Sequence, residues 1–260
     1  MADEARRQHM PYGGHCPDAV PLAEASDAGQ RIVEHLHALL LAASTRHEEI
    51  RHALTRIKIP PHPRGNRHYG RGPYGGDRHR AWLRQIHHLE WTAVRSYYPD
   101  RADRLLDRLA ANGTRFTPAL TALTAPAARS HPDGPDGPED PGDGPDAARL
   151  RGIHAHRLHL VAELHRRGVP LLAAGTRPGE LHEELVQLAE GAGLGAPAAL
   201  RAATVEPARA LGLADEAGTV APGKAADLVV LAAGADPLHD VRAVRRIDAV
   251  VVRGRLYVAG

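Results

Sequence analysis

The sequence contains few aromatic residues and a single cysteine. Only 3% of its 260 residues are Phe, Trp or Tyr, so a core must be built mainly from Ala, Leu and Val. Cys16 stands alone, which excludes an internal disulfide framework and fits a reducing compartment. No apolar run approaches transmembrane length, and the segment MADEARRQHM lacks the apolar stretch of a secretory signal. We therefore expect a cytoplasmic protein with no membrane partner.

The chain also lacks the short motifs of several large enzyme classes. It has no GxSxG nucleophile elbow, no P-loop, no CxxC pair, and no GxGxxG between a strand and a helix. Paired carboxylates occur at Glu48-Glu49 and at Glu183-Glu184, both on stretches with helical character. We interpret both pairs as solvent-exposed helix faces.

Charge is distributed unevenly, although the formal net charge is only +2. Residues 51–90 form a basic segment with a tract rich in Gly, Pro and Arg, which we interpret as an insertion. Residues 131–146 read HPDGPDGPEDPGDGPD, with six acids and no Lys or Arg, and this composition predicts a flexible linker. The basic segment leaves open a polyanion-binding protein, but no recognition motif accompanies it, so we do not expect a nucleic-acid partner.

The last sixty residues contain the strongest pattern. Good helix formers precede Thr204, and Pro207 suits the first turn of a second helix, which Gly212 can end. The β-branched runs at 227–231 and 249–252 predict buried strands. In order, the block contains Ala203-Thr204, Pro207-Ala208, Leu211-Gly212-Leu213, Gly218, Pro222-Gly223-Lys224, Ala226-Asp227-Leu228-Val229-Val230 and Pro237-Leu238. This series resembles the C-terminal end of amidohydrolase-superfamily enzymes, where it would serve as scaffold.

A second block, near the N-terminus, extends the resemblance. Gly14-His15 and then Ile32-Val33-Glu34-His35-Leu36 are similar to the fifth and sixth barrel strands of imidazolonepropionase-like and Xaa-Pro-dipeptidase-like members. In that family each of these strands ends in a metal-binding histidine. The resemblance therefore implies that His15 and His35 are ligands of a divalent metal, with zinc first. Barrel active sites lie at the C-terminal ends of the strands, and imidazole suits zinc. Two histidines alone predict only weak binding.

A third block resembles the eighth strand and the helix after it. Residues 169–174 are an apolar run typical of a strand that is buried on both faces. The family follows this strand with Gly-Thr-Asp, whose carboxylate binds metal and accepts the proton of the attacking water. This chain has Arg177 at that position, and a guanidinium neither binds a cation nor accepts a proton. His182, in the following helix, is a candidate on the substrate side.

The middle of the chain completes the predicted order of elements. Residues 97–111 predict an amphipathic helix and residues 147–167 predict another. Residues 114–123 resemble the family's seventh strand, although Pro118 is unusual in a central strand. The first-strand His-x-His pair and the fourth-strand lysine of the family are not matched. Two His-x-His strings do occur, at 35–37 and 154–156, and we interpret both as incidental.

These observations predict an α/β protein. Residues 1–213 would form the C-terminal half of a (β/α)8 metal-dependent hydrolase barrel, and residues 214–260 the C-terminal strands of a small composite β-domain. The resemblance implies metal-assisted hydrolysis of a carbon–nitrogen bond in an amide, a cyclic amide or a dipeptide. A homo-oligomer or a complementing N-terminal half would complete the barrel. The alternative is a truncated, inactive homologue that acts as a scaffold or anion-binding protein.

Overall fold

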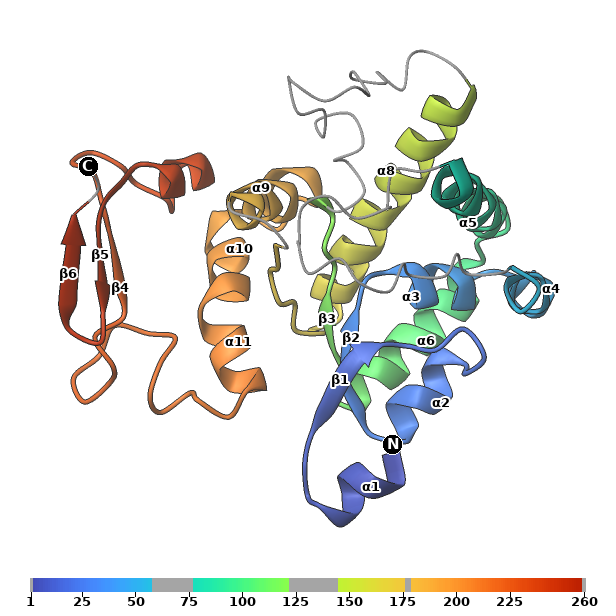
Figure 1. Ribbon diagram of the computed structural model, residues 1–260, viewed down its shortest axis with the longest axis horizontal. Helices are drawn as coiled ribbons and strands as arrows, with labels where there is room; N and C mark the ends of the chain where they lie inside the picture. The colour runs from blue at the N-terminus through green and yellow to red at the C-terminus, as the bar shows by residue number, and fades with distance from the viewer. Residues whose placement is uncertain (1, 58–76, 122–144, 176–178, 259–260) are drawn as a thin grey trace.

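The structure is a computed structural model that describes residues 2–57, 77–121, 145–175 and 179–258. A parallel sheet and its helices form the larger part, and a small antiparallel sheet lies at the C-terminal end (Figure 1). A short helix, α1 (Ala2–Arg7), precedes the first strand. The mixed α/β fold predicted from the sequence is confirmed.

The parallel sheet is built in chain order. Its strands are β1 (Tyr12–His15), β2 (Gln30–Glu34) and β3 (Arg115–Thr117). A parallel bridge joins Phe116 of β3 to Leu171, and the Leu172 N–H donates to the Phe116 carbonyl at 2.8 Å. Strands that add side by side in sequence order, all parallel, are the arrangement of a barrel sector. β3 ends before Pro118, which cannot donate to a strand ladder.

Helices connect the strands and cover the sheet. The described helices between β1 and β3 are α2 (Leu22–Asp27), α3 (His37–Ala42), α4 (His47–Leu54), α5 (Asp77–Arg95) and α6 (Pro99–Ala111). After β3 come α8 (Pro145–Arg166), α9 (Glu180–Val186), the π-helical turn η2 (Gln187–Gly191), α10 (Ala196–Ala203) and α11 (Val205–Ala210). In Figure 1, α2 and α6 lie beside one another next to the three strands.

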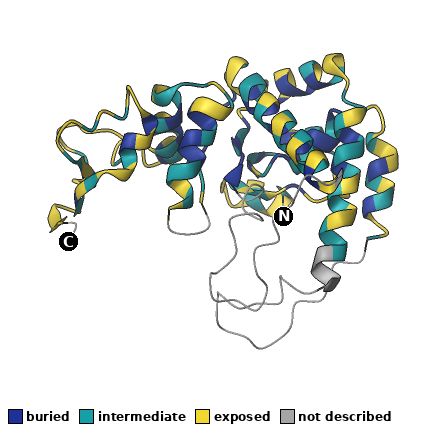
Figure 2. Ribbon diagram, turned by 90° about the horizontal axis from the view of Figure 1, so that it is seen from above, coloured by how far each residue is buried: buried dark blue, intermediate teal, exposed yellow. Residues whose placement is uncertain are grey.

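The core is aliphatic, as the composition predicts. Val33 of β2 and Phe116 of β3 are fully buried at the centre of the sheet, together with leucines from the surrounding helices. In Figure 2 the buried segments lie mainly in the interior of the larger part, and the exposed segments lie at its surface. Each buried Leu or Val contributes roughly 1.5–3 kcal/mol relative to an exposed one. This core holds the ends of β1 and β2 in place.

Two long helices agree closely with their prediction. α6 begins at Pro99, where a proline fits the first turn, and its leucines 105, 106 and 109 are buried on one face. Gly113 follows with φ +66°, a left-handed conformation that suits the residue after a helix. α8 covers the span predicted at 147–167. It packs tightly on α5, because a Cβ at Gly152 would lie 2.4 Å from the Trp91 ring.

The C-terminal sheet is antiparallel. It contains β4 (Leu228–Leu231), β5 (Ile247–Val252) and β6 (Arg255–Val258), with the 3-10 turn η3 (Val241–Arg245) before β5. The strands lie where the sequence predicts two of them, but the prediction that they are buried is wrong. Val229 is 58% exposed and its neighbour Val230, which points to the opposite face of the strand, is 43% exposed. Ion pairs from Arg245 to Glu183 (2.7 Å) and from Arg242 to Glu190 connect η3 to α9 and η2.

The two charged segments are described only in part. The described parts of the basic segment are the last residues of α4, a turn at 55–57, and α5 from Asp77. Of the acidic segment, only Pro145 and Asp146 lie in the described residues, and they begin α8. Among the described residues, no helix is both long and apolar enough to span a membrane. The proposed division after residue 213 stays a prediction.

Candidate functional site

The two histidines singled out in the sequence meet at the ends of neighbouring strands. His15 is the last residue of β1, and His35 directly follows β2. Their ring centroids are 4.7 Å apart, with the ring planes at 63°. Because β1 and β2 are parallel, their carboxyl ends lie at the same edge of the sheet, as barrel active sites require. The expected proximity of His15 and His35 is therefore observed.

A third donor, Glu34, belongs to the same cluster and was missed in the sequence. Its Oε2 atom lies 2.8 Å from the Nδ1 atom of His15, and one ligand atom from each of His15, Glu34 and His35 lies within 4.8 Å of the others. Glu34 is the register partner of His15 across the two strands. Strand alternation places residues 34 and 35 on opposite faces, so the pattern gave no reason to group them.

The backbone at His35 explains how both neighbours reach one point. His35 has φ +60°, in the left-handed region, so the strand alternation stops at Glu34. Its N–H donates to the carbonyl of Thr117 at the end of β3, with a distance of 2.8 Å. This hydrogen bond anchors the turned residue between two strands. Non-glycine residues in this region are costly and concentrate at functional sites.

The chemistry of the three donors fits a divalent metal. Imidazole nitrogen and carboxylate oxygen are both zinc ligands, and metal binding needs the imidazole in its neutral form. Burial, followed by the effect of the neighbouring His15, lowers the pKa of His35 and favours that form. The side chains of His15 and Glu34 are 71% and 45% exposed, so the cluster is open on one side. The residues present could hold an ion and leave positions for water or substrate.

The cluster opens into a cavity large enough for a small molecule. The cavity has a volume of about 320 Å³, at the lower end of the range for ligand sites. Its wall includes His15, Glu34 and His35 together with Asp18, His37 and Trp82. The cavity therefore combines polar donors with an aromatic side chain.

His37 in this wall is held by a buried ion pair. Its Nδ1 atom lies 2.8 Å from Oε1 of Glu90, and the same oxygen accepts from the Arg157 guanidinium. Glu90 and Arg157 are 2% and 3% exposed. Burial raises the pKa of Glu90, but the charge of Arg157 and the His37 hydrogen bond outweigh it, and the pKa falls to about 2. Glu90 therefore stays ionised and fixes the orientation of the His37 ring.

The two His-x-His strings do not form first-strand metal pairs. His37 bonds Glu90, and among the described residues it is not part of the three-donor cluster with His35. In the other string, both histidines lie on α8. His154 Nε2 is 3.2 Å from Gln187 Oε1, and the His156 ring packs edge-on against Tyr97 at 4.6 Å. The interpretation of both strings as incidental agrees with these contacts.

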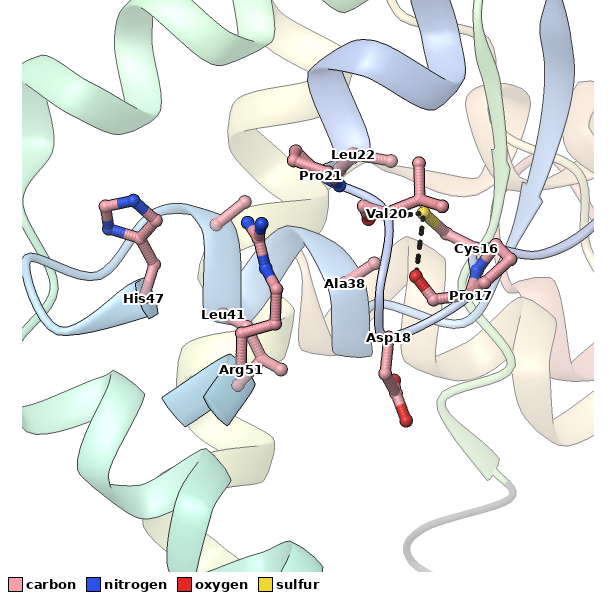
Figure 3. Close-up of a pocket in the computed structure, with 11 residues that line it drawn as sticks. Cys16, Pro17, Asp18, Val20, Pro21, Leu22, Ala38, Leu41, His47 and Arg51 are labelled. Atoms are coloured by element: carbon pink, nitrogen blue, oxygen red, sulfur yellow. Dashed lines mark hydrogen bonds between the residues drawn. The ribbon is translucent and has the colours of Figure 1, made fainter. Parts of the chain in front are cut away.

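A smaller cavity lies between the loop after β1 and the helices α3 and α4. It measures about 30 Å³, roughly the volume of one water molecule. Figure 3 shows the Cys16 thiol turned toward the carbonyls of Pro17 and Val20, the latter at 3.6 Å. Burial, with the nearby Asp18 charge, raises the pKa of Cys16 to about 11. A thiol in this state is a poor nucleophile and a poor metal ligand.

The other residues singled out in the sequence contribute less. Arg177 lies outside the described residues, so its role stays a prediction. His182 is half-buried on α9, and it is not part of the donor cluster found among the described residues. The interpretation of the acidic pairs as exposed faces holds for Glu48-Glu49 but is wrong for Glu184, which is completely buried. Glu184 instead accepts the N–H of Thr121 at 3.1 Å, beyond β3.

Solved structures with a similar fold include amidohydrolases. A bottromycin amidohydrolase matches with a TM-score of 0.61 and 20% identity, over 99% of this chain and 52% of that one. A prolidase complexed with N-methylphosphonate-L-proline matches with a TM-score of 0.57 and 17% identity, over 100% and 48%. Ochratoxinase from A. niger matches with a TM-score of 0.59 and 16% identity, over 99% of this chain and 44% of that one. The chain thus spans about half the length of these proteins.

The sequence itself matches a known family over nearly its whole length. No curated protein gives a significant match. The profile of the amidohydrolase family, however, matches residues 1–257. The mixed α/β fold with its parallel strands in sequence order agrees with that match. The chain belongs to the amidohydrolase family.

Proposed function

We propose that this chain forms part of the active site of a metal-dependent hydrolase that cleaves carbon–nitrogen bonds. The observation that carries the proposal is the meeting of His15 and His35 at the ends of adjacent parallel strands, with ring centroids 4.7 Å apart. These two side chains would hold the metal, with zinc first. A bound metal lowers the pKa of its water toward neutrality and polarises the substrate carbonyl.

The substrates we propose are an amide, a cyclic amide or a dipeptide. The names of two structural neighbours, an amidohydrolase and a prolidase, support this class. The cavity of about 320 Å³ beside the donors fits a molecule of dipeptide size. Arg177 replaces the family's aspartate and cannot accept a proton, but its guanidinium can pair with a substrate carboxylate. His182 stays a candidate for the substrate side.

Completion of the site by a second polypeptide is part of the proposal. Among the described residues, β1 pairs only with β2, so its outer edge is free to accept a strand. In the C-terminal sheet, Leu256 and Val258 are 60% and 71% exposed. A complementing N-terminal half would cover both surfaces. Without it we expect self-association, which light scattering would measure and which Leu256→Lys with Val258→Lys should reduce.

The test combines zinc content with turnover. Zinc binding should depend on both histidines, so His15→Asn and His35→Asn should each lower it, whereas the exposed His159→Asn on α8 should not. Hydrolysis of Xaa-Pro dipeptides and N-acyl amino acids is then measured for the chain alone and with the N-terminal half of the prolidase. We expect turnover only in the paired sample, and we expect a chelator to abolish it. Chelator-resistant turnover, or zinc binding that ignores both histidines, would contradict the proposal.

A further inference from the structure

We propose that Glu34 is a direct metal ligand, so that His15, Glu34 and His35 form a centre of two imidazoles and one carboxylate. The resemblance noted in the sequence assigns only the two histidines. The inference rests on the proposed function for the presence of a metal, but not on hydrolysis. It makes Glu34 a residue of the site rather than a neighbour of it.

The first support is the backbone, which directs three side chains to one point. Parallel register sets Glu34 opposite His15, so both side chains leave the sheet on the same face. The left-handed turn at His35, with φ +60°, redirects the next side chain toward that face. The hydrogen bond to the Thr117 carbonyl keeps the turn in place. The main chain thus starts all three side chains toward the same side of the strand ends.

The second support is the spacing of the donor atoms. Ligands about 2.1 Å from a tetrahedral ion lie roughly 3.4 Å from one another. The His15 Nδ1 to Glu34 Oε2 distance is 2.8 Å, and all three donors lie within 4.8 Å of each other. The closest pair must separate by about 0.6 Å, and a pair at the 4.8 Å limit must approach by about 1.4 Å, to reach tetrahedral spacing. The ion would replace the proton that His15 Nδ1 and Glu34 Oε2 share in the 2.8 Å contact.

The third support is charge. Two neutral imidazoles leave both positive charges of a divalent ion uncompensated, whereas one carboxylate removes half of that charge. Among the described residues, the ion pair found for Glu34 is with His15, so no Lys or Arg salt bridge competes for its oxygens. The exposed side of the cluster leaves the remaining positions to water or substrate, which is the pattern of catalytic rather than structural zinc.

The competing explanation is that Glu34 only orients His15 through a hydrogen bond. Glu34→Gln separates the two roles, because the amide oxygen still accepts a hydrogen bond but is a poor ligand. Loss of an orienting partner typically lowers metal affinity by about 10–100-fold. Loss of a ligand should lower zinc affinity by more than about 100-fold, measured on the full chain by competition with a chromophoric chelator. Glu24→Gln, at an exposed position of α2, is the matched control.

A second variant counts ligands directly. Glu34→His offers an imidazole of similar reach. The number of imidazole ligands that X-ray absorption spectroscopy counts around the zinc should therefore rise from two to three. Glu24→His should leave the count at two, and melting curves verify that each variant folds. A count that stays at two in Glu34→His, zinc affinity in Glu34→Gln within about 100-fold of wild type, or a wild-type chain that takes up no zinc would each overturn the assignment.

The outcomes also separate this inference from the proposed function. Zinc bound through Glu34 in a chain that never hydrolyses a substrate would refute the function and keep the ligand. Chelator-sensitive turnover that persists unchanged in Glu34→Gln would do the reverse.

Discussion

Replacing Glu184 with glutamine should stabilise the protein above neutral pH. Glu184 lies on α9 and is 0% exposed. Its Oε2 atom accepts the Thr121 N–H at 3.1 Å, while Oε1 has no hydrogen-bond partner among the described residues. Burial raises the pKa of Glu184 to about 7, although backbone hydrogen bonds beyond β3 oppose the change. The folded protein therefore holds a proton that the unfolded chain releases near its ordinary value of 4.5.

The sign and size follow from proton linkage. Between pH 4.5 and 7 the folded state binds more protons at Glu184 than the unfolded state, so the free energy of unfolding falls as pH rises. Each unit of pKa difference corresponds to about 1.4 kcal/mol, which gives a loss of about 3 kcal/mol by pH 8. Glutamine keeps the oxygen that accepts from Thr121 and cannot ionise. The variant should therefore lie within about 1 kcal/mol of wild type at pH 5 and exceed it by about 3 kcal/mol at pH 8.

Urea denaturation of both proteins at pH 5, 6, 7 and 8 measures this difference. Other titrating groups are shared, so subtracting the two curves isolates Glu184. Glu183→Gln is the matched control, because Glu183 lies next in sequence and pairs with Arg245 at the surface. It should shift stability by less than about 1 kcal/mol at every pH. A difference between Glu184→Gln and wild type that stays constant from pH 5 to 8 would refute the reasoning.

Three further changes have defined outcomes. Arg157→Met removes the partner of buried Glu90 and should lower the free energy of unfolding by about 3–5 kcal/mol, measured by denaturation. Arg151→Met, at an exposed position of α8, is the control and should change this free energy by less than about 0.5 kcal/mol. Gly152→Ala should lower stability by about 1–2 kcal/mol, since overpacking against α5 exceeds the gain in helix propensity; a melting temperature at or above wild type would count against this packing. Arg177→Asp should raise zinc affinity roughly tenfold by removing a repelling charge, without turnover in the chain alone.

The sequence was sufficient where local pattern decides structure. α6 and α8 could be predicted because leucine spacing, an N-terminal proline and a following glycine all agree. The ends of β1 and β2 could be predicted because the stretches around His15 and His35 resemble the fifth and sixth strands of the family. Burial in the C-terminal sheet could not be predicted, because β-branched runs have the same composition whether or not another layer covers them. Val229, predicted to be buried, is therefore found exposed.

The contacts that define the site depend on residues far apart in the chain. Glu90 meets Arg157 across 67 positions, and Glu184 meets Thr121 across 63, so neither burial could be inferred from nearby sequence. Glu34 was missed for a different reason. Strand alternation separates it from His35, and only the left-handed φ of His35 brings the two together. A single backbone angle therefore decides which side chains form the cluster.

That angle leads to a final prediction, on the cost of the cluster to stability. His35 is held at φ +60°, which costs a residue with a Cβ roughly 1–2 kcal/mol, whereas glycine adopts it freely. His35→Gly and His35→Ala both delete the imidazole, so their difference reports the backbone alone. Glycine normally destabilises relative to alanine, but here His35→Gly should be the more stable by about 1 kcal/mol in denaturation. If His35→Ala proved the more stable of the two, the left-handed turn would not be the feature that brings Glu34 and His35 together.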